Sequence, residues 1–285
     1  MRDTDPRVVL GLHRSRHERL LLTEALDLGV TALDTSANYL DFRSHEVLAQ
    51  MAGDLLSKFT LSTKVGYFPG PGKTEHSLDP VRLYTAVEQA ARVLGRQPDV
   101  VFLHNPERSL QETTPQNQDL LAQACAALER ATTNGLCGTW GIASWYPPPL
   151  LSLIDTTIPR PSVFMVRAGL LVGVATIDAA EALTTAWDLS SGMVWGMSPF
   201  GGSTQAPVWG KIDPRVFIRD GTGLSRLQAA FRAAYRLPQV SAVAVGTNDS
   251  AHLNELVGTL DSAVDEPAIR QYRSLLRTQP NGQLV

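Results

Sequence analysis

Four ionisable residues follow short apolar runs of this sequence. Asp34, Lys64 and His104 each end such a run, and Tyr39 lies five residues beyond Asp34. Reducing a carbonyl requires a hydride at carbon and a proton at oxygen. A Tyr hydroxyl gives that proton more readily when a nearby Lys lowers its pKa, which is ordinarily about 10. An Asp can hold the Lys charged, and a His can hydrogen-bond the carbonyl oxygen and polarise it. The four residue types therefore predict acid–base chemistry at a carbonyl or alcohol carbon, with no metal.

The elements that would position these residues alternate along the whole chain. Strands are expected at 8–12, 30–34, 59–64, 100–104, 138–143, 162–166, 193–197 and 241–245. Helices are expected at 17–28, 44–53, 80–94, 116–134, 149–154, 178–189, 224–236 and 250–260, with a last one at 266–277. Such alternation predicts a parallel sheet covered by helices, and eight units predict one (β/α)8 barrel domain over residues 1–285. The carboxyl ends of barrel strands meet on one face, so the four side chains are expected to converge there.

Local signals support these elements. Asp79-Pro80 is typical of a helix start, and Asn134-Gly135 is typical of a helix end. Two long segments rich in turn residues, 66–79 and 198–223, are expected to be loops that shape a substrate pocket.

The bulk properties restrict the class of partner. The chain has 285 residues, a net charge of −3 and no basic run, which argues against nucleic acid as a partner. It contains no apolar stretch long enough for a membrane span, and residues 1–7 lack the apolar core of a signal peptide, so we expect a cytoplasmic protein. Cys125 and Cys137 have neither disulfide nor zinc spacing and are expected to be core thiols.

Several segments resemble the aldo-keto reductase superfamily. They are Asp34-Thr35-Ser36-Ala37-Asn38-Tyr39 with Glu46, Ser62-Thr63-Lys64, Leu103-His104-Asn105-Pro106, the run 135–144, Ser198-Pro199-Phe200-Gly201, and Gly246-Thr247 with His252-Leu253-Asn254-Glu255. The resemblance covers about residues 8–256, and a narrower similarity points to the L-galactose and D-threo-aldose dehydrogenase branch. It implies an oxidoreductase that uses NAD(P)H on a small or medium carbonyl compound or alcohol. Tyr39 would be the acid in reduction and the base in oxidation.

The resemblance also implies a nicotinamide subsite, and this chain departs from the family pattern there. Ala143 and Ser144 stand where most members have a Ser-Asn pair that binds the carboxamide. The family's Gln falls near Met165, with Arg167 two residues on, and the Tyr that stacks on the ring falls at Met197. A thioether can lie against a ring but cannot replace lost amide hydrogen bonds, each worth about 0.5–1.5 kcal/mol.

At the nucleotide end, Gly246-Thr247 precedes a predicted helix whose backbone N–H groups could face phosphate. His252 stands where NADP-binding members have an Arg. The residues expected to bind cofactor are Ser144, Arg167, Met197, Ser198, Phe200, Gly201, Gly246, Thr247, Asn248, His252 and Glu255. We favour NADP(H) over NAD(H), and loss of nucleotide binding is the alternative.

Side chains near the strand ends are candidates for substrate contact. His13, Tyr67 and Trp145 are expected to line the pocket, with Phe68 beside Tyr67. His45 and His76 are expected to face solvent.

Two other classes of function stay open. A redox-neutral lyase, dehydratase, isomerase or cyclase could use the same four residues without a nicotinamide cofactor. A non-catalytic barrel, such as an ion-channel auxiliary subunit, is a weaker alternative because all four residues are present. The sequence does not choose between a monomer and a homo-oligomer, and it does not name the substrate.

Overall fold

A computed structural model describes residues 7–110 and 112–278 of the chain. The strands are β1 (Arg7–Gly11), β2 (Ala32–Asp34), β3 (Thr60–Val65), β4 (Tyr67–Gly70), β5 (Lys73–His76), β6 (Val100–His104), β7 (Thr139–Ser144), β8 (Val163–Arg167), β9 (Val194–Met197) and β10 (Ala242–Val245). Strands β4 and β5 form a separate antiparallel hairpin. The other strands follow one another in the closed order β1-β10-β9-β8-β7-β6-β3-β2. This order confirms the predicted (β/α)8 barrel.

The register of neighbouring strands explains why the candidate residues meet. Asp34 of β2 pairs with Ser62 of β3, two residues before Lys64. His104, at the end of β6, pairs with Ala143 of β7. Because these strands are parallel, their last residues lie at one edge of the sheet.

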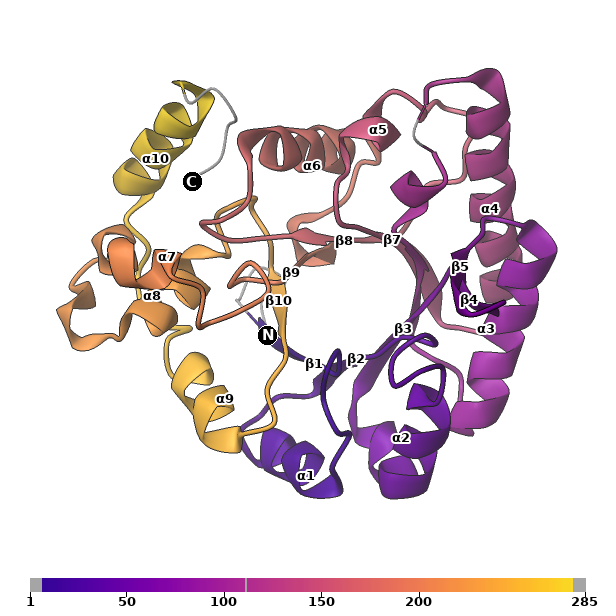
Figure 1. The fold of residues 1–285 in the computed structure, drawn as a ribbon, viewed down its shortest axis with the longest axis horizontal. Coiled ribbons are helices and arrows are strands. Elements are labelled where there is room, and N and C mark those ends of the chain that lie inside the picture. Colours follow the sequence, from indigo (N-terminus) through magenta and orange to yellow (C-terminus); the bar gives the residue numbers. More distant parts are fainter. Residues whose placement is uncertain (1–6, 111, 279–285) are drawn as a thin grey trace. The chain divides into compact units, whose positions relative to one another are not determined.

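The helices agree with the predicted pattern, with shifted ends. They are α1 (Arg19–Asp27), α2 (Ser44–Ala52), α3 (Pro80–Leu94), α4 (Pro115–Thr133), α5 (Pro148–Leu151), α6 (Val174–Ala186), α7 (Val208–Lys211), α8 (Arg226–Ala233), α9 (Ser250–Val257) and α10 (Glu266–Thr278). Short 3-10 helices occupy Gly53–Lys58, Pro106–Arg108, Ser191–Met193, Pro214–Phe217 and Gly221–Gly223. Figure 1 shows α3 and α4 along the outer side of β3, β6 and β7.

Two helix starts show how local chemistry sets the bounds. The Asp79 side chain accepts hydrogen bonds from the backbone N–H groups of Val81 and Arg82, so α3 begins at Pro80 as predicted. Helix α8 begins two residues later than expected, because Ser225 and Gln228 form a reciprocal capping box in front of it. Gly135 has a φ of 72°, and this left-handed conformation lets the chain leave α4 as the sequence predicts.

The chain divides into two compact units. One consists of residues 9–165 and 246–250, and the other of residues 1–8, 166–245 and 251–285, of which 1–6 and 279–285 lie outside the described residues. We call them the first unit and the second unit. In the second unit, β9 and β10 pair in parallel, with Ala242 opposite Trp195. The Tyr235 hydroxyl donates to the backbone oxygen of Arg7, 2.7 Å away.

Two sequence predictions about loops were wrong. The segment 66–79 contains the β4–β5 hairpin, because Pro71-Gly72 makes a turn between two runs that pair from Tyr67↔His76 to Gly70↔Lys73. Within 198–223, α7 and two 3-10 helices form. Both cysteines are buried, as predicted.

Two further findings concern membrane spans and metal sites. Over the described ranges, no helix has the length and apolar character to cross a membrane. In the same residues, no group of three His, Cys, Asp or Glu side chains is placed to hold a metal ion.

Candidate active site

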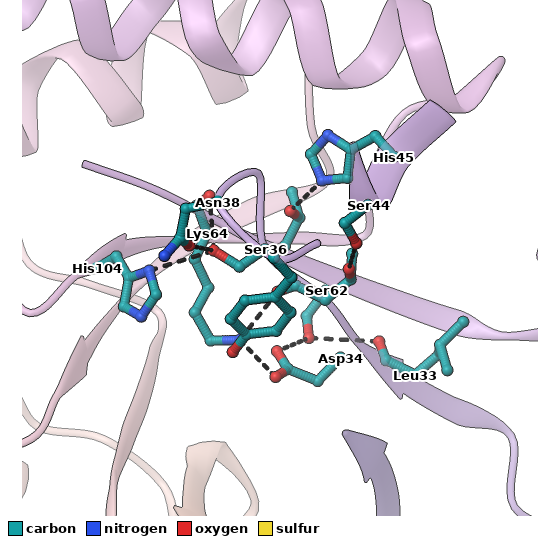
Figure 2. Close-up of polar contacts among 12 residues, drawn as sticks. Leu33, Asp34, Ser36, Asn38, Ser44, His45, Ser62, Lys64 and His104 are labelled. Carbon is teal, nitrogen blue, oxygen red and sulfur yellow. Dashed lines mark hydrogen bonds and ion pairs between the residues drawn. The ribbon is translucent and has the colours of Figure 1, made fainter. Parts of the chain in front are cut away.

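A buried ion pair forms the centre of the site. Lys64 on β3 is 2% exposed, and its ammonium donates to the carboxylate of Asp34 on β2. It also donates to the backbone oxygen of Thr35 at 2.9 Å and to the Tyr39 hydroxyl at 3.3 Å. An ammonium has three N–H donors, so Lys64 is fully satisfied. Figure 2 shows the Lys64 side chain extended toward Asp34.

The electrostatics of this cluster keep Lys64 charged. Burial alone would lower the pKa of Lys64, but the charge of Asp34 and the contact with Tyr39 outweigh it and raise that pKa above its ordinary value. The second carboxylate oxygen of Asp34 accepts a hydrogen bond from Ser62 at 2.7 Å. The ion pair is therefore hydrogen-bonded on both sides, which favours a single geometry.

The expected lowering of the Tyr39 pKa was wrong. Burial raises the pKa of Tyr39 more than Lys64 lowers it, so the hydroxyl stays protonated near neutral pH. The charge of Lys64 lowers the pKa of Tyr39, as expected, but the opposite charge of Asp34 raises it. A phenol that keeps its proton is suited to donate it to an oxygen that gains negative charge during reaction.

His104 is held from three sides. Its Nδ1 lies 3.2 Å from the Ser36 hydroxyl oxygen, and its ring meets the Tyr67 ring edge-on at 4.8 Å. Its backbone oxygen accepts a hydrogen bond from Nε2 of His76 at 2.8 Å. Burial, followed by the charge of Lys64, holds the pKa of His104 well below its ordinary value. The imidazole is therefore neutral near pH 7.

His13 extends the cluster from the end of β1. Its ring lies 5.0 Å from the Tyr39 ring. Burial and the charge of Arg14 lower the pKa of His13. The predicted pocket residue thus adjoins the Tyr39 ring.

The prediction that His45 and His76 face solvent was wrong. His45 is 6% exposed and its Nε2 lies 2.8 Å from the Thr63 hydroxyl. His76 is half-buried because the β4–β5 hairpin, missed in the sequence, folds it over the end of β6. Both histidines support residues next to the cluster.

A pocket of about 650 Å³ lies in the same unit beyond His104. We call it the outer pocket, and it is lined by Asn105, Glu107, Arg108, Trp145, Tyr146 and Pro149. Trp145 and Tyr146 are 44% and 49% exposed. Tyr67 contacts both His104 and two residues of the pocket lining. Its ring packs against His104, its hydroxyl accepts a hydrogen bond from Asn105 at 3.3 Å, and its ring lies 5.6 Å from the Arg108 guanidinium.

Glu107 fixes the aromatic side of the outer pocket. One of its carboxylate oxygens accepts from the backbone N–H groups of Trp145 at 2.7 Å and Tyr146 at 3.0 Å. Burial raises the pKa of Glu107, although these N–H groups and the nearby Ser144 hydroxyl pull it down. Neither Oε2 of Glu107 nor Oγ of Ser144 completes a hydrogen bond within the described residues.

The other predicted residues of this unit lie in two places. Ser144 ends β7 and is buried, and its hydroxyl lies near the Glu107 carboxylate. Gly246, Thr247 and Asn248 follow β10, and Oδ1 of Asn248 accepts the backbone N–H of Arg16 at 3.1 Å. A side chain at Gly246 would approach the backbone oxygens of Gly11 and His13 to 3.2 and 3.3 Å, so the backbone is closely packed there.

The remaining cofactor predictions fall in the second unit. Arg167 ends β8, and burial lowers its pKa. Ser198 and Gly201 both have left-handed backbones that close the turn after β9. Phe200 is buried against Trp209 and Phe231. His252 and Glu255 lie on exposed positions of α9.

Sequence reasoning missed four residues that contact the cluster or the outer pocket. They are Ser36, Asn38, Glu107 and Tyr146. Ser36 and Asn38 lie in the same motif as Asp34 and Tyr39, which could have drawn attention to them. Glu107 and Tyr146 carry no sequence signal, because their contact depends on two loops meeting.

Comparison with known sequences agrees with this geometry. A sequence model of the aldo/keto reductase family matches residues 14–204, which is more than half of the chain. The barrel carries a buried Asp34 and Lys64 with a half-buried Tyr39 and His104 beside them, and this chain belongs to the aldo/keto reductase family. A search of curated proteins gave no significant match.

Solved structures show the same fold. An aldo-keto reductase from Bacillus halodurans in its holo form is 18% identical, with a TM-score of 0.70 over 94% of this chain and 91% of that one. One from Klebsiella pneumoniae, in complex with NADP and acetate, is 17% identical, with a TM-score of 0.70 over 99% and 95%. MGS-M4, from a Medee basin deep-sea metagenome library, is 15% identical, with a TM-score of 0.71 over 98% and 93%.

Proposed function

We propose that this protein reduces the carbonyl group of a small or medium substrate with NADPH, or oxidises the corresponding alcohol. The observation that carries the proposal is the position of the Tyr39 hydroxyl, 3.3 Å from a buried ammonium that Asp34 holds in place. The ammonium stabilises the phenolate that forms when Tyr39 gives up its proton. Membership of the aldo/keto reductase family supports this chemistry.

Each residue of the cluster has one role in this proposal. Tyr39 donates the proton to the carbonyl oxygen in reduction and removes it in oxidation. Lys64 stabilises the Tyr39 phenolate, and Asp34 orients Lys64. His104 is neutral and donates a hydrogen bond from Nε2 to the same carbonyl oxygen, which favours the negative charge that develops there.

The nicotinamide cofactor would supply the hydride. Two features of this chain fit such a group. The buried Ser144 hydroxyl could bind the carboxamide, and the N–H groups after Gly246 could face phosphate. Relatives of this fold were solved with NADP and NADPH, and for this reason we propose NADPH in preference to NADH. Arg167, Met197, Ser198, Phe200, Gly201, Thr247, Asn248, His252 and Glu255 complete the proposed cofactor contacts.

A direct binding experiment tests the proposal. Purified protein is titrated with NADPH and with NADH, and binding is followed by Trp fluorescence and by calorimetry. We expect NADPH to bind in the micromolar range and to be oxidised when a panel of aldehydes and ketones is added. If neither nucleotide binds at millimolar concentration, the reductase proposal is wrong and the cluster serves a redox-neutral reaction.

A further inference from the structure

Ser36 lies at the junction of three polar groups beside His104. Its hydroxyl oxygen is 2.6 Å from Oδ1 of Asn38, 3.2 Å from Nδ1 of His104 and 3.5 Å from the backbone oxygen of Lys64. Ser36 is fully buried. Figure 2 shows its hydroxyl between Asn38 and His104. A serine hydroxyl has one proton, so it cannot donate to both neighbours at once.

The direction of this proton decides which nitrogen of His104 carries a hydrogen. A neutral imidazole has one N–H and one lone pair. If Ser36 donates to Asn38, Nδ1 of His104 must donate to Ser36, and Nε2 is left as an acceptor. If Ser36 donates to His104, Nδ1 is the acceptor and Nε2 carries the hydrogen.

Carbonyl reduction requires the arrangement in which Ser36 donates to Nδ1 of His104 and Nε2 carries the hydrogen. A carbonyl oxygen needs donors, and a bare Nε2 lone pair would repel it. The amide of Asn38 can turn by half a rotation and present Nδ2 to Ser36 with almost the same shape. The chain of donors then runs from Asn38 to Ser36 to His104.

We propose that Ser36 and Asn38 are positioning residues that fix the neutral tautomer of His104 with its hydrogen on Nε2, where it can meet the substrate oxygen. The direction of donation rests on the proposed function, and the hydrogen-bonded contacts are those of the described structure. The low pKa of His104 supports a neutral ring, for which the choice of tautomer matters. Neither Ser36 nor Asn38 needs to touch substrate.

The test uses nitrogen NMR of the His104 ring, which distinguishes a protonated from an unprotonated nitrogen without turnover. The full-length protein is labelled at its histidines, and His104 is assigned by its loss in His104→Gln. We expect Nε2 to carry the hydrogen in the wild type. A hydrogen on Nδ1 in the wild type would overturn the proposal.

Two variants test the chain of hydrogen-bond donors from Asn38 through Ser36 to His104, which we call the relay. Asn38→Asp puts an acceptor-only carboxylate next to Ser36, so the serine proton turns away from His104 and the ring hydrogen should move to Nδ1. Ser36→Ala removes the link, and we expect a mixture of the two tautomers. Asn105→Asp is the matched control, because it adds the same charge beside His104 without contacting Ser36. Its tautomer should stay as in the wild type. An Asn38→Asp protein with the wild-type tautomer, or an Asn105→Asp protein that shifts equally, would contradict the relay.

Turnover supplies a second measurement. We expect kcat of carbonyl reduction to fall about ten- to a hundredfold in Asn38→Asp and by less in Ser36→Ala, with KM for NADPH unchanged. If the tautomers behave as proposed but no variant, nor the wild type, turns over any carbonyl, the relay stands and the reductase proposal fails. Equal kcat in all variants despite shifted tautomers would show that His104 is not positioned for catalysis in this way.

Discussion

The Asp34–Tyr39–Lys64–His104 cluster and the outer pocket belong to the same unit but are organised differently. In the cluster, the polar groups satisfy one another: the Lys64 ammonium has three acceptors, and Asp34 accepts from both Lys64 and Ser62. In the outer pocket, Oδ1 of Asn105 and Oε2 of Glu107 are buried without a partner within the described residues. Two large aromatic side chains there are exposed to solvent.

We propose that the cluster carries out the chemistry and that the outer pocket recognises the substrate. Buried charges need partners before any ligand arrives, because an unpaired charge in the interior is costly. A surface that recognises a ligand leaves apolar area and hydrogen-bonding capacity unused until the ligand binds. We therefore expect changes in the cluster to affect rate and stability, and changes in the outer pocket to affect substrate affinity.

The largest effect is expected at Tyr39. Tyr39→Phe removes the proton donor but keeps the ring that packs on His13, so kcat should fall roughly 10²–10⁴-fold. Steady-state kinetics with NADPH and the best carbonyl substrate measure this, and thermal unfolding should confirm an intact fold. Unchanged kcat would refute the assignment of Tyr39 as the acid.

The ion pair at Asp34 is expected to matter for folding as well. Asp34→Asn leaves the buried Lys64 without its counter-charge and should lower the free energy of unfolding by roughly 3–5 kcal/mol. The matched control is Asp54→Asn, because Asp54 makes a comparable pair with Arg19, with contacts of 2.5 and 2.7 Å, at the exposed surface. Solvent screens that pair, so its loss should leave urea unfolding almost unchanged. Equal destabilisation by the two variants would remove the contrast between buried and exposed pairs.

The buried His45, which contacts Thr63 next to Lys64, should make the free energy of unfolding fall at acidic pH. Burial, together with the charges of His17 and Lys64, lowers the pKa of His45 to about 4. Since the unfolded chain takes up this proton near its ordinary pKa of 6.5, stability should fall as the pH drops from about 6.5 to about 4. The contribution of His45 to this loss is about 3 kcal/mol.

His45→Gln can keep the hydrogen bond to Thr63 but cannot take up a proton. Its unfolding free energy, measured by urea titration at a series of pH values, should therefore fall less on acidification than that of the wild type. Parallel pH profiles for the two proteins would exclude His45 as a source of the acid sensitivity.

The smallest effect is expected in the outer pocket. Trp145→Ala removes an exposed ring from the wall, so KM for an apolar substrate should rise about tenfold while kcat changes little. Leu20→Ala, which removes an exposed apolar side chain on α1, is the control and should leave both constants unchanged. A large fall in kcat for Trp145→Ala would mean that the pocket takes part in the chemistry itself.

Most of the barrel, and the gathering of Asp34, Tyr39, Lys64 and His104 in one cluster, could be predicted from the sequence. Apolar runs of four to six residues, each separated by an amphipathic helix, indicate buried parallel strands, and β6 and α3 have the predicted bounds. Asp34 and His104 end their strands and Lys64 stands one residue before the end of β3, and parallel strands bring their ends to one edge of the sheet. Local periodicity and strand direction were sufficient for these conclusions.

The tertiary structure decided what depends on burial and on contacts between distant segments. The sequence predicts a lowered Tyr39 pKa from the type of neighbour, but the degree of burial reverses the sign. The contacts of His45 with Thr63, of Glu107 with the 145–146 backbone, and of Ser36 with His104 each join residues 18 to 68 positions apart. No local pattern encodes such pairs, because desolvation and hydrogen-bond geometry exist only once the chain has packed.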